Sequence, residues 1–183
     1  MKQITIIFSI LLLMSCGSEN PSSTSQKVEI PKYETVTAML KANSDYEGRN
    51  FEVISEIPIH IRISSEFLNE DSEKTMIDQT KRDIIYVAFQ TFTQSEVNEI
   101  TITSIPIIRE SFNPNMAYDG KQLKKLSQTK TISRKQAQII LEKYVKTKSF
   151  NDLYQQNGTL FLPNNKFDLL KYEQLDNVFN ELK

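Results

Sequence analysis

The stretch from Ser72 to Phe92 constrains the fold more than any other part of the chain, because its apolar residues repeat with the period of a helix over about twenty positions. These residues fall within one broad stripe: Ile77, Ile84, Ile85, Ala88, Phe89 and Phe92. A helix of this kind buries its stripe against the rest of a domain. Asp71 or Ser72 can cap its first turn. We therefore expect the main core helix here.

Alternating segments on both sides of this helix predict strands. Residues 57–63 carry an isoleucine at every second position, and Pro58 indicates a sheet edge or the beginning of a strand. Residues 99–108 alternate as well, but the phase changes at Ser104, which predicts a bulge. A third strand is expected over residues 126–132.

Further helices are predicted at both ends of the chain. A short one is expected over residues 33–42. The next begins after Ser133, which forms a capping box with Gln136 and precedes an apolar stripe over residues 137–145. A last helix is expected over residues 167–182, with Asn164 or Asn165 as its cap.

The segment 149–163 is compatible with two structures. Asn157-Gly158 can turn a hairpin, or it can end a short helix with glycine in the left-handed position. We favour the helix ending, so that the order of elements becomes strand, helix, strand, strand, helix, helix. This order predicts an α+β fold in two layers, a small antiparallel or mixed sheet covered by helices, as a single globular domain over residues 33–183. The half-polar strands predict one sheet face that is wet or used for binding.

The first sixteen residues have the three parts of an export signal. Lys2 gives a cationic start, an apolar run follows from Ile4 to Met14, and small polar residues come next. The run is too short for a transmembrane helix, which needs about 20 apolar residues. We expect residues 1–15 to be a signal peptide.

The sequence Leu13-Met14-Ser15-Cys16 resembles the lipobox of bacterial lipoprotein precursors. Met14 stands where Ala, Ser, Thr or Val is commoner. The resemblance implies cleavage before Cys16, acylation of the new N-terminus and attachment to a membrane of the cell envelope, the outer membrane if the cell is Gram-negative. Residues 16–32 then form the lipidated N-terminus and a flexible, serine-rich linker. The alternative is a plain secretory signal with an incidental thiol.

Composition excludes several classes of site. Cys16 is the only cysteine, so the mature domain has no internal disulfide, thiolate nucleophile or cysteine-based zinc site. Four glycines leave no room for a GxGxxG motif or a P-loop, and a net charge of −1 predicts no attraction to nucleic acid. We expect no cofactor and no metal.

Two groups of residues are candidates for binding. His60 and Arg62 lie on the polar face of the first predicted strand; a single histidine cannot build a histidine-based metal site, and a partly exposed strand histidine is the simpler interpretation. Arg134 and Lys135 belong to a basic segment, residues 121–148, in which Glu142 is the only acid. This segment can meet anionic headgroups, an acidic glycan or an acidic envelope protein, or it is simply a solvated helix face.

These features favour a membrane-anchored, non-catalytic binding or accessory domain of the bacterial envelope. One alternative is a carboxylate-based hydrolase that uses Glu66 or Asp71, with His60 or Arg62 assisting. Another is a lipid-anchored immunity or inhibitor protein. The acidic residues between positions 66 and 78 also permit a calcium site, although acidic residues before a helix have a simpler role at its positive end.

Overall fold

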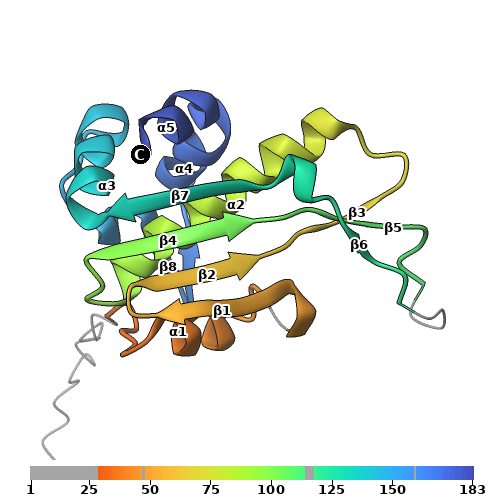
Figure 1. The fold of residues 1–183 in the computed structure, drawn as a ribbon. Coiled ribbons are helices and arrows are strands. Elements are labelled where there is room, and N and C mark those ends of the chain that lie inside the picture. The colour runs from red at the N-terminus through yellow and green to blue at the C-terminus, as the bar shows by residue number, and fades with distance from the viewer. Residues whose placement is uncertain (1–28, 47, 114–117, 159) are drawn as a thin grey trace, which may run out of the picture.

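The computed structural model describes residues 29–46, 48–113, 118–158 and 160–183, so the signal segment with Cys16 lies outside the described residues. A four-stranded mixed sheet forms one layer, with β1 antiparallel to β2, β2 parallel to β4 and β4 antiparallel to β7. These strands are β1 (Phe51–Glu56), β2 (Ile59–Ile63), β4 (Glu99–Ser104) and β7 (Gln128–Ser133). Helices cover one face of this sheet, which confirms the predicted two-layer α+β fold (Figure 1).

Five α-helices are present in the described ranges: α1 (Val36–Asn43), α2 (Glu73–Gln94), α3 (Arg134–Ile140), α4 (Asn165–Asp168) and α5 (Leu175–Glu181). Single π-helical turns extend α3 over Leu141–Val145 and separate α4 from α5 over Leu169–Glu173. Short 3-10 turns occur at Gly48–Asn50, Lys124–Leu126 and Phe150–Leu153. The predicted last helix is therefore two helices joined by a distorted turn.

The core is built around α2, as its long apolar stripe predicts. Ser72 caps the helix by accepting a hydrogen bond from the backbone N–H of Thr75. From Asp83 onward nearly every residue of α2 is buried, including polar ones such as Gln90 and Thr93. The sheet packs against one side of this half, while α5 and the Phe150–Leu153 turn pack against others. Because other elements cover this half of α2 on several sides, its buried residues are not confined to a single stripe.

Two sheet elements differ from the sequence prediction. The structure contains β1, which was not predicted because Ile54 faces outward and interrupts the alternation of Phe51 and Val53. The favoured helix ending in residues 149–163 was wrong, since β8 (Tyr154–Asn157) and β9 (Leu160–Pro163) form an antiparallel hairpin. Gly158 has φ +61° in the hairpin turn, where glycine adopts the left-handed conformation without strain.

The predicted strand 99–108 is divided between two sheets. After Ser104 the chain enters β5 (Ile107–Arg109), which belongs to a second sheet with β3 (Glu66–Leu68) and β6 (Lys121–Gln122). The parallel pair β2 and β4 continues as the parallel pair β3 and β5, linked by a backbone bond of 3.0 Å from Ile105 N to Ile63 O. The phase change at Ser104 thus marks the passage from one sheet to the other.

The capping box at Ser133 is present in part. The Ser133 hydroxyl accepts a bond of 3.2 Å from the backbone N–H of Gln136, as predicted. The Gln136 side chain does not return to Ser133, however, and donates instead to the backbone carbonyl of Glu181. The first turn of α3 is therefore tied to the end of α5, which brings the last helix onto the rest of the fold.

A buried carboxylate holds the place where the sheets diverge. Asp83 on α2 is only 2% exposed and accepts four hydrogen bonds: from Ser65 (2.8 Å), Ser104 (3.0 Å), Tyr46 (3.1 Å) and Gln79 (2.7 Å). Burial raises the pKa of Asp83, and these hydrogen bonds oppose the rise. The ends of β2 and β4 are thereby fixed to the core helix.

The raised pKa of Asp83 predicts a pH dependence of stability that the variant Asp83→Asn lacks. Because the folded protein holds the Asp83 proton more tightly than the unfolded chain, wild type loses stability relative to Asp83→Asn as the pH rises above about 4. Urea denaturation of both proteins between pH 3 and pH 8 measures this difference. A difference that stays constant across the range would contradict the assignment.

Candidate functional site

A polar groove opens at the carboxyl end of β2, beside the buried Asp83. Its volume is about 500 Å³. Its walls come from four places in the chain: the segment before β1, the residues that follow β2, the first half of α2, and Phe112 after β5. The lining residues are Asp45, Tyr46, Asn50, Ser64, Ser65, Glu66, Phe67, Gln79 and Phe112. The groove lies where the chain passes from β2 in the four-stranded sheet to β3 in the three-stranded sheet.

Two polar atoms in the groove wall are buried without a hydrogen-bond partner in the described part of the chain. They are the hydroxyl oxygen of Ser64, a residue only 2% exposed, and the amide oxygen Oδ1 of Asn50. The backbone around them is ordinary, since Ser64 N donates to Asn50 O at 3.0 Å. A buried polar group without a partner costs about 1–3 kcal/mol. These two are among seven such atoms in the described residues, and both belong to residues that line the groove.

Glu66 is one of the two carboxylates that line the groove, with Asp45. Its carboxylate accepts hydrogen bonds from Arg109 Nη1 (2.8 Å), Asn50 Nδ2 (3.3 Å) and Tyr118 Oη (3.3 Å). Burial by itself raises the pKa of Glu66, but the bonds from Arg109 and Asn50 outweigh this and lower it. Arg109 also pairs with Asp119 at 3.5 Å. Glu66 is therefore an ionised acceptor held in place, and not a proton donor.

The residues of the hydrolase alternative lie in separate places. His60 contacts the Thr103 hydroxyl at 2.9 Å, and Arg62 pairs with Glu52 at 2.9 Å, both on the sheet face opposite to the buried Ile61 and Ile63. Glu66 follows six residues after His60 on a nearly extended chain, which separates them by roughly 15–20 Å. Asp71 accepts a hydrogen bond from Leu68 N at 2.8 Å and closes a turn. No acid–base pair is assembled from these four residues.

The acidic residues between positions 66 and 78 also have separate partners. Glu73 pairs with Lys125, while Asp78 pairs with Lys74 and, at 3.8 Å, with Lys81. Within the described ranges no three His, Cys, Asp or Glu side chains come together as a metal site requires. The structure thus gives these acids a role in surface ion pairs around α2.

The basic segment 121–148 does not form one surface. Several of its cations are engaged: Lys125 with Glu73, Lys143 with Glu181, and Lys130 with the carbonyl of Leu182. The exposed cations of the segment lie on either side of the six-residue strand β7, with Lys121 and Lys124 before it and Lys135 and Lys148 after it. Such a strand is about 20 Å long, so the two groups are far apart.

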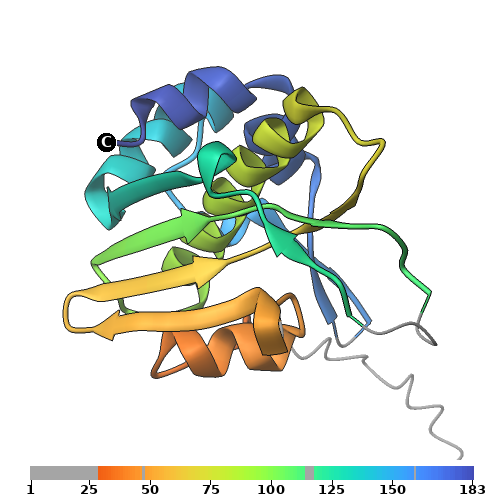
Figure 2. The same cartoon turned by 45° about the vertical axis from the view of Figure 1, so that its right-hand side comes forward.

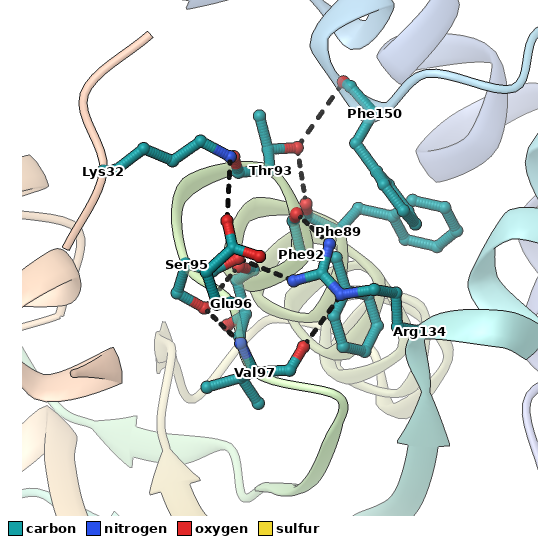
Figure 3. Close-up of polar contacts among 10 residues, drawn as sticks. Lys32, Phe89, Phe92, Thr93, Ser95, Glu96, Val97, Arg134 and Phe150 are labelled. Carbon is teal, nitrogen blue, oxygen red and sulfur yellow. Dashed lines mark hydrogen bonds and ion pairs between the residues drawn. The ribbon is translucent and has the colours of Figure 1, made fainter. Parts of the chain in front are cut away.

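Arg134 has a specific place in the fold, at the C-terminal end of α2 (Figure 3). Its guanidinium donates to three backbone carbonyls: Phe92 O (2.6 Å), Ser95 O (2.6 Å) and Val97 O (3.0 Å). The same group lies 5.6 Å from the ring centre of Phe150. Cations that bind the last carbonyls of a helix stabilise its negative end. We therefore do not retain Arg134 among the candidate binding residues, whereas Lys135 beside it is exposed.

The N-terminal segment of the described chain is fixed to the same helix end (Figure 3). Lys32 Nζ donates to the carbonyl of Thr93 at 2.6 Å, and the backbone N–H of Tyr33 donates to the carbonyl of Gln94 at 2.8 Å. The side chain of Asn43, at the end of α1, donates to Gln94 Oε1 at 2.7 Å. The point where the chain enters the domain is thus defined by contacts with α2.

Comparison with known proteins finds no matching family model, no matching curated protein and no matching solved structure. None of the helices in the described ranges is both long and apolar enough to cross a bilayer. The proposals below therefore depend on the sequence signal and on the geometry alone.

Of the residues at the groove, the sequence interpretation named Glu66 and missed Asp83, Ser64, Asn50 and Arg109. Asp83 carries a recognisable signal, because it occupies the helical stripe of Met76 and Val87, where a carboxylate must be buried and satisfied. Ser64 follows directly after an alternating strand, where ligand-binding residues are common in sheets with parallel strands. Asn50 and Arg109 carry no local signal.

The role of Arg134 is tested by Arg134→Met, which keeps an apolar stem and removes three charge-assisted hydrogen bonds. We expect the free energy of unfolding to fall by about 3 kcal/mol. The matched control is Lys135→Met, an exposed neighbour for which we expect a change within about 0.5 kcal/mol. Urea denaturation measures both. If the two substitutions lower the free energy of unfolding equally, Arg134 does not stabilise the end of α2.

Proposed function

We propose that this chain is a lipid-anchored lipoprotein of the bacterial envelope whose domain binds a small polar ligand, without converting it, in the groove at the end of β2. The observation that carries the binding half is the pair of unpartnered buried atoms, Ser64 Oγ and Asn50 Oδ1, in the groove wall. The anchoring half rests on the lipobox at Leu13-Met14-Ser15-Cys16 and on the linker that follows it.

The groove favours a ligand rich in hydrogen-bond donors. Asn50 Oδ1 is an acceptor, and the carboxylates of Asp45 and Glu66 are acceptors as well. The residues that line the groove include no lysine or arginine to attract an anion. Hydroxyl or amine groups of a ligand would satisfy these acceptors, whereas a phosphate or a carboxylate would meet like charge. Ser64 Oγ can both donate and accept, so it suits a hydroxyl group.

An exposed aromatic side chain adds an apolar contact. Phe112 is 51% exposed and lines the groove, and it lies 5.5 Å from the Arg109 guanidinium. A sugar ring combines hydroxyl donors at its rim with an apolar face of C–H groups, so it can stack on Phe112 while its hydroxyls reach Ser64 and Asn50. The ligand class we infer is therefore a neutral or amino sugar.

The electrostatics of the groove support binding over chemistry. Glu66 has a lowered pKa and is held by three donors, so it does not supply a proton near neutral pH. Asp83 is turned toward four donors of the protein itself. His60, the one histidine of the chain, lies on the open face of the sheet and contacts Thr103. The acidic residues of the groove therefore act as fixed acceptors.

The groove is tested by Ser64→Ala, which has opposite effects on stability and on binding. Because the Ser64 hydroxyl has no partner, its removal should leave the free energy of unfolding unchanged or raise it by up to about 1 kcal/mol. Binding of a sugar should weaken by about 10-fold, the effect of losing one hydrogen bond of about 1.4 kcal/mol. Urea denaturation measures the first, and NMR titration with glucose, glucosamine and N-acetylglucosamine measures the second.

The matched control for this substitution is Ser95→Ala. Ser95 is equally buried, at 1% exposed, but its hydroxyl donates to Thr91 O at 2.7 Å. We expect this variant to lose about 1 kcal/mol of stability and to bind as wild type does. If none of the three sugars shifts the resonances of Ser64, Asn50 or Phe112, the assigned ligand class is wrong. Unchanged binding by Ser64→Ala would remove Ser64 from the site.

The anchor is tested by Cys16→Ala in cells. We expect wild type to sediment with membranes and to be released by detergent but not by salt, because acyl chains hold it through apolar contacts. The variant should lose this attachment. Fractionation with mass spectrometry of the mature N-terminus measures both. A wild-type protein that stays soluble and carries an unmodified Cys16 would contradict the anchor.

A further inference from the structure

The β8–β9 hairpin exposes apolar side chains that the rest of the domain does not cover. Leu160 is 62% exposed and Leu162 is 40% exposed, whereas Phe161 between them packs against the core. Alternation along β9 places the two leucines on the same side of the hairpin. In Figure 1 the hairpin passes behind the four-stranded sheet, and in Figure 2 it lies to one side of that sheet and extends downward from the helices at the top. The exposed leucines thus form one small apolar face on a projecting element.

The composition of the hairpin is unusual for a surface element. Residues 153–165 contain no charged residue, in a chain of which 25% of residues are charged. Isolated two-stranded hairpins and exposed strand edges in water are commonly protected by charged side chains. This hairpin carries none, and it presents Gln155 and Asn157, the cross-strand partners of Leu162 and Leu160, beside the leucines. Uncharged polar and aliphatic side chains together suit the interface between water and lipid, where burial of a charge is costly.

The hairpin lies beside the point where the chain enters the domain. Glu29, Ile30 and Lys32 line a cavity of about 560 Å³ together with Tyr154 and Phe161 of the hairpin. The contacts of Lys32 and Tyr33 with the end of α2 fix this segment. Only residues 17–28 separate it from Cys16. A serine-rich linker of twelve residues, as the sequence predicts here, would span on the order of 17–21 Å, so a lipid attached to Cys16 would keep the hairpin close to the membrane.

We propose that the exposed face of the β8–β9 hairpin rests on the lipid surface that holds Cys16, with Leu160 and Leu162 in the interfacial layer. This inference rests on the anchoring half of the proposed function. Two leucines bind a membrane weakly by themselves, but the linker makes their contact intramolecular and so raises their effective concentration. The contact orients the domain, because one side of it then faces the bilayer.

The chain offers a direct test, because it contains no tryptophan and a single cysteine. The mature chain, residues 16–183, is coupled through Cys16 to maleimide-bearing lipid in vesicles of phosphatidylethanolamine and phosphatidylglycerol. Leu160→Trp then provides the only tryptophan. We expect its emission to shift to shorter wavelength on coupling, and brominated lipids to quench at least half of it. Leu162→Trp repeats the measurement if the first variant fails to fold.

The matched control is Tyr172→Trp, an exposed position (58%) between α4 and α5, at the end of the molecule away from the hairpin turn. We expect no quenching there. Equal quenching at both positions, or none at position 160, would overturn the inference. A blue shift that appears without lipid and grows with protein concentration would mean that a second copy covers the leucines, and would overturn it as well.

This experiment separates the inference from the proposal it depends on. Coupling through maleimide replaces acylation by the cell, so the fluorescence reports the hairpin contact whether or not Cys16 is acylated in vivo. An unmodified Cys16 in cells, together with quenching at position 160, would refute the natural anchor and retain the lipid-binding hairpin face. Modified Cys16 without quenching would retain the anchor and refute the hairpin contact.

Discussion

The hydrogen bonds to Asp83 are the constraint on which the rest of the structure depends. This carboxylate is buried in the middle of the fold, and its partners are hydroxyls and an amide from four separate segments. Two of them, Ser65 and Ser104, stand where parallel strands pass from the large sheet into the small one. The same divergence opens the groove lined by Ser64 and Glu66. The hydrogen bonds that fix the fold at Asp83 therefore lie beside the candidate binding site.

The fold class could be predicted because the long periodic segments obey local rules. The helix over residues 72–92 combines a wide apolar stripe with a capping serine, and the alternation at residues 59–63 permits no other element. The failures have equally physical causes. In β1 the outward Ile54 blurs the alternation, and at Asn157-Gly158 a left-handed glycine suits a helix end as well as the hairpin turn that the structure contains. Both elements have apolar residues facing away from the core, which a periodicity argument cannot detect.

The candidate site was harder to predict, because it is made by contacts between distant residues. Arg134 was chosen for its charge, but its role comes from carbonyls about forty positions earlier in the chain. His60 and Arg62 were placed correctly on an open sheet face, yet the groove is lined by Asn50, Ser64 and Glu66, and Arg109 acts on it only through its hydrogen bond to Glu66. No short motif joins these four residues. The lysines of residues 121–148 are close in sequence but do not form one basic surface, because β7 separates those before it from those after it.

The attachment of the N-terminal segment to the end of α2 has a mechanical consequence. Any pull from the proposed lipid anchor would reach the domain through Lys32 and Tyr33, which both donate to carbonyls in the last turn of α2, the longest of the described helices. Arg134 ties that same turn to the start of α3. Tension is thus delivered to the most deeply buried element and shared with the sheet around it. A domain loaded in this way resists being peeled open strand by strand from an edge.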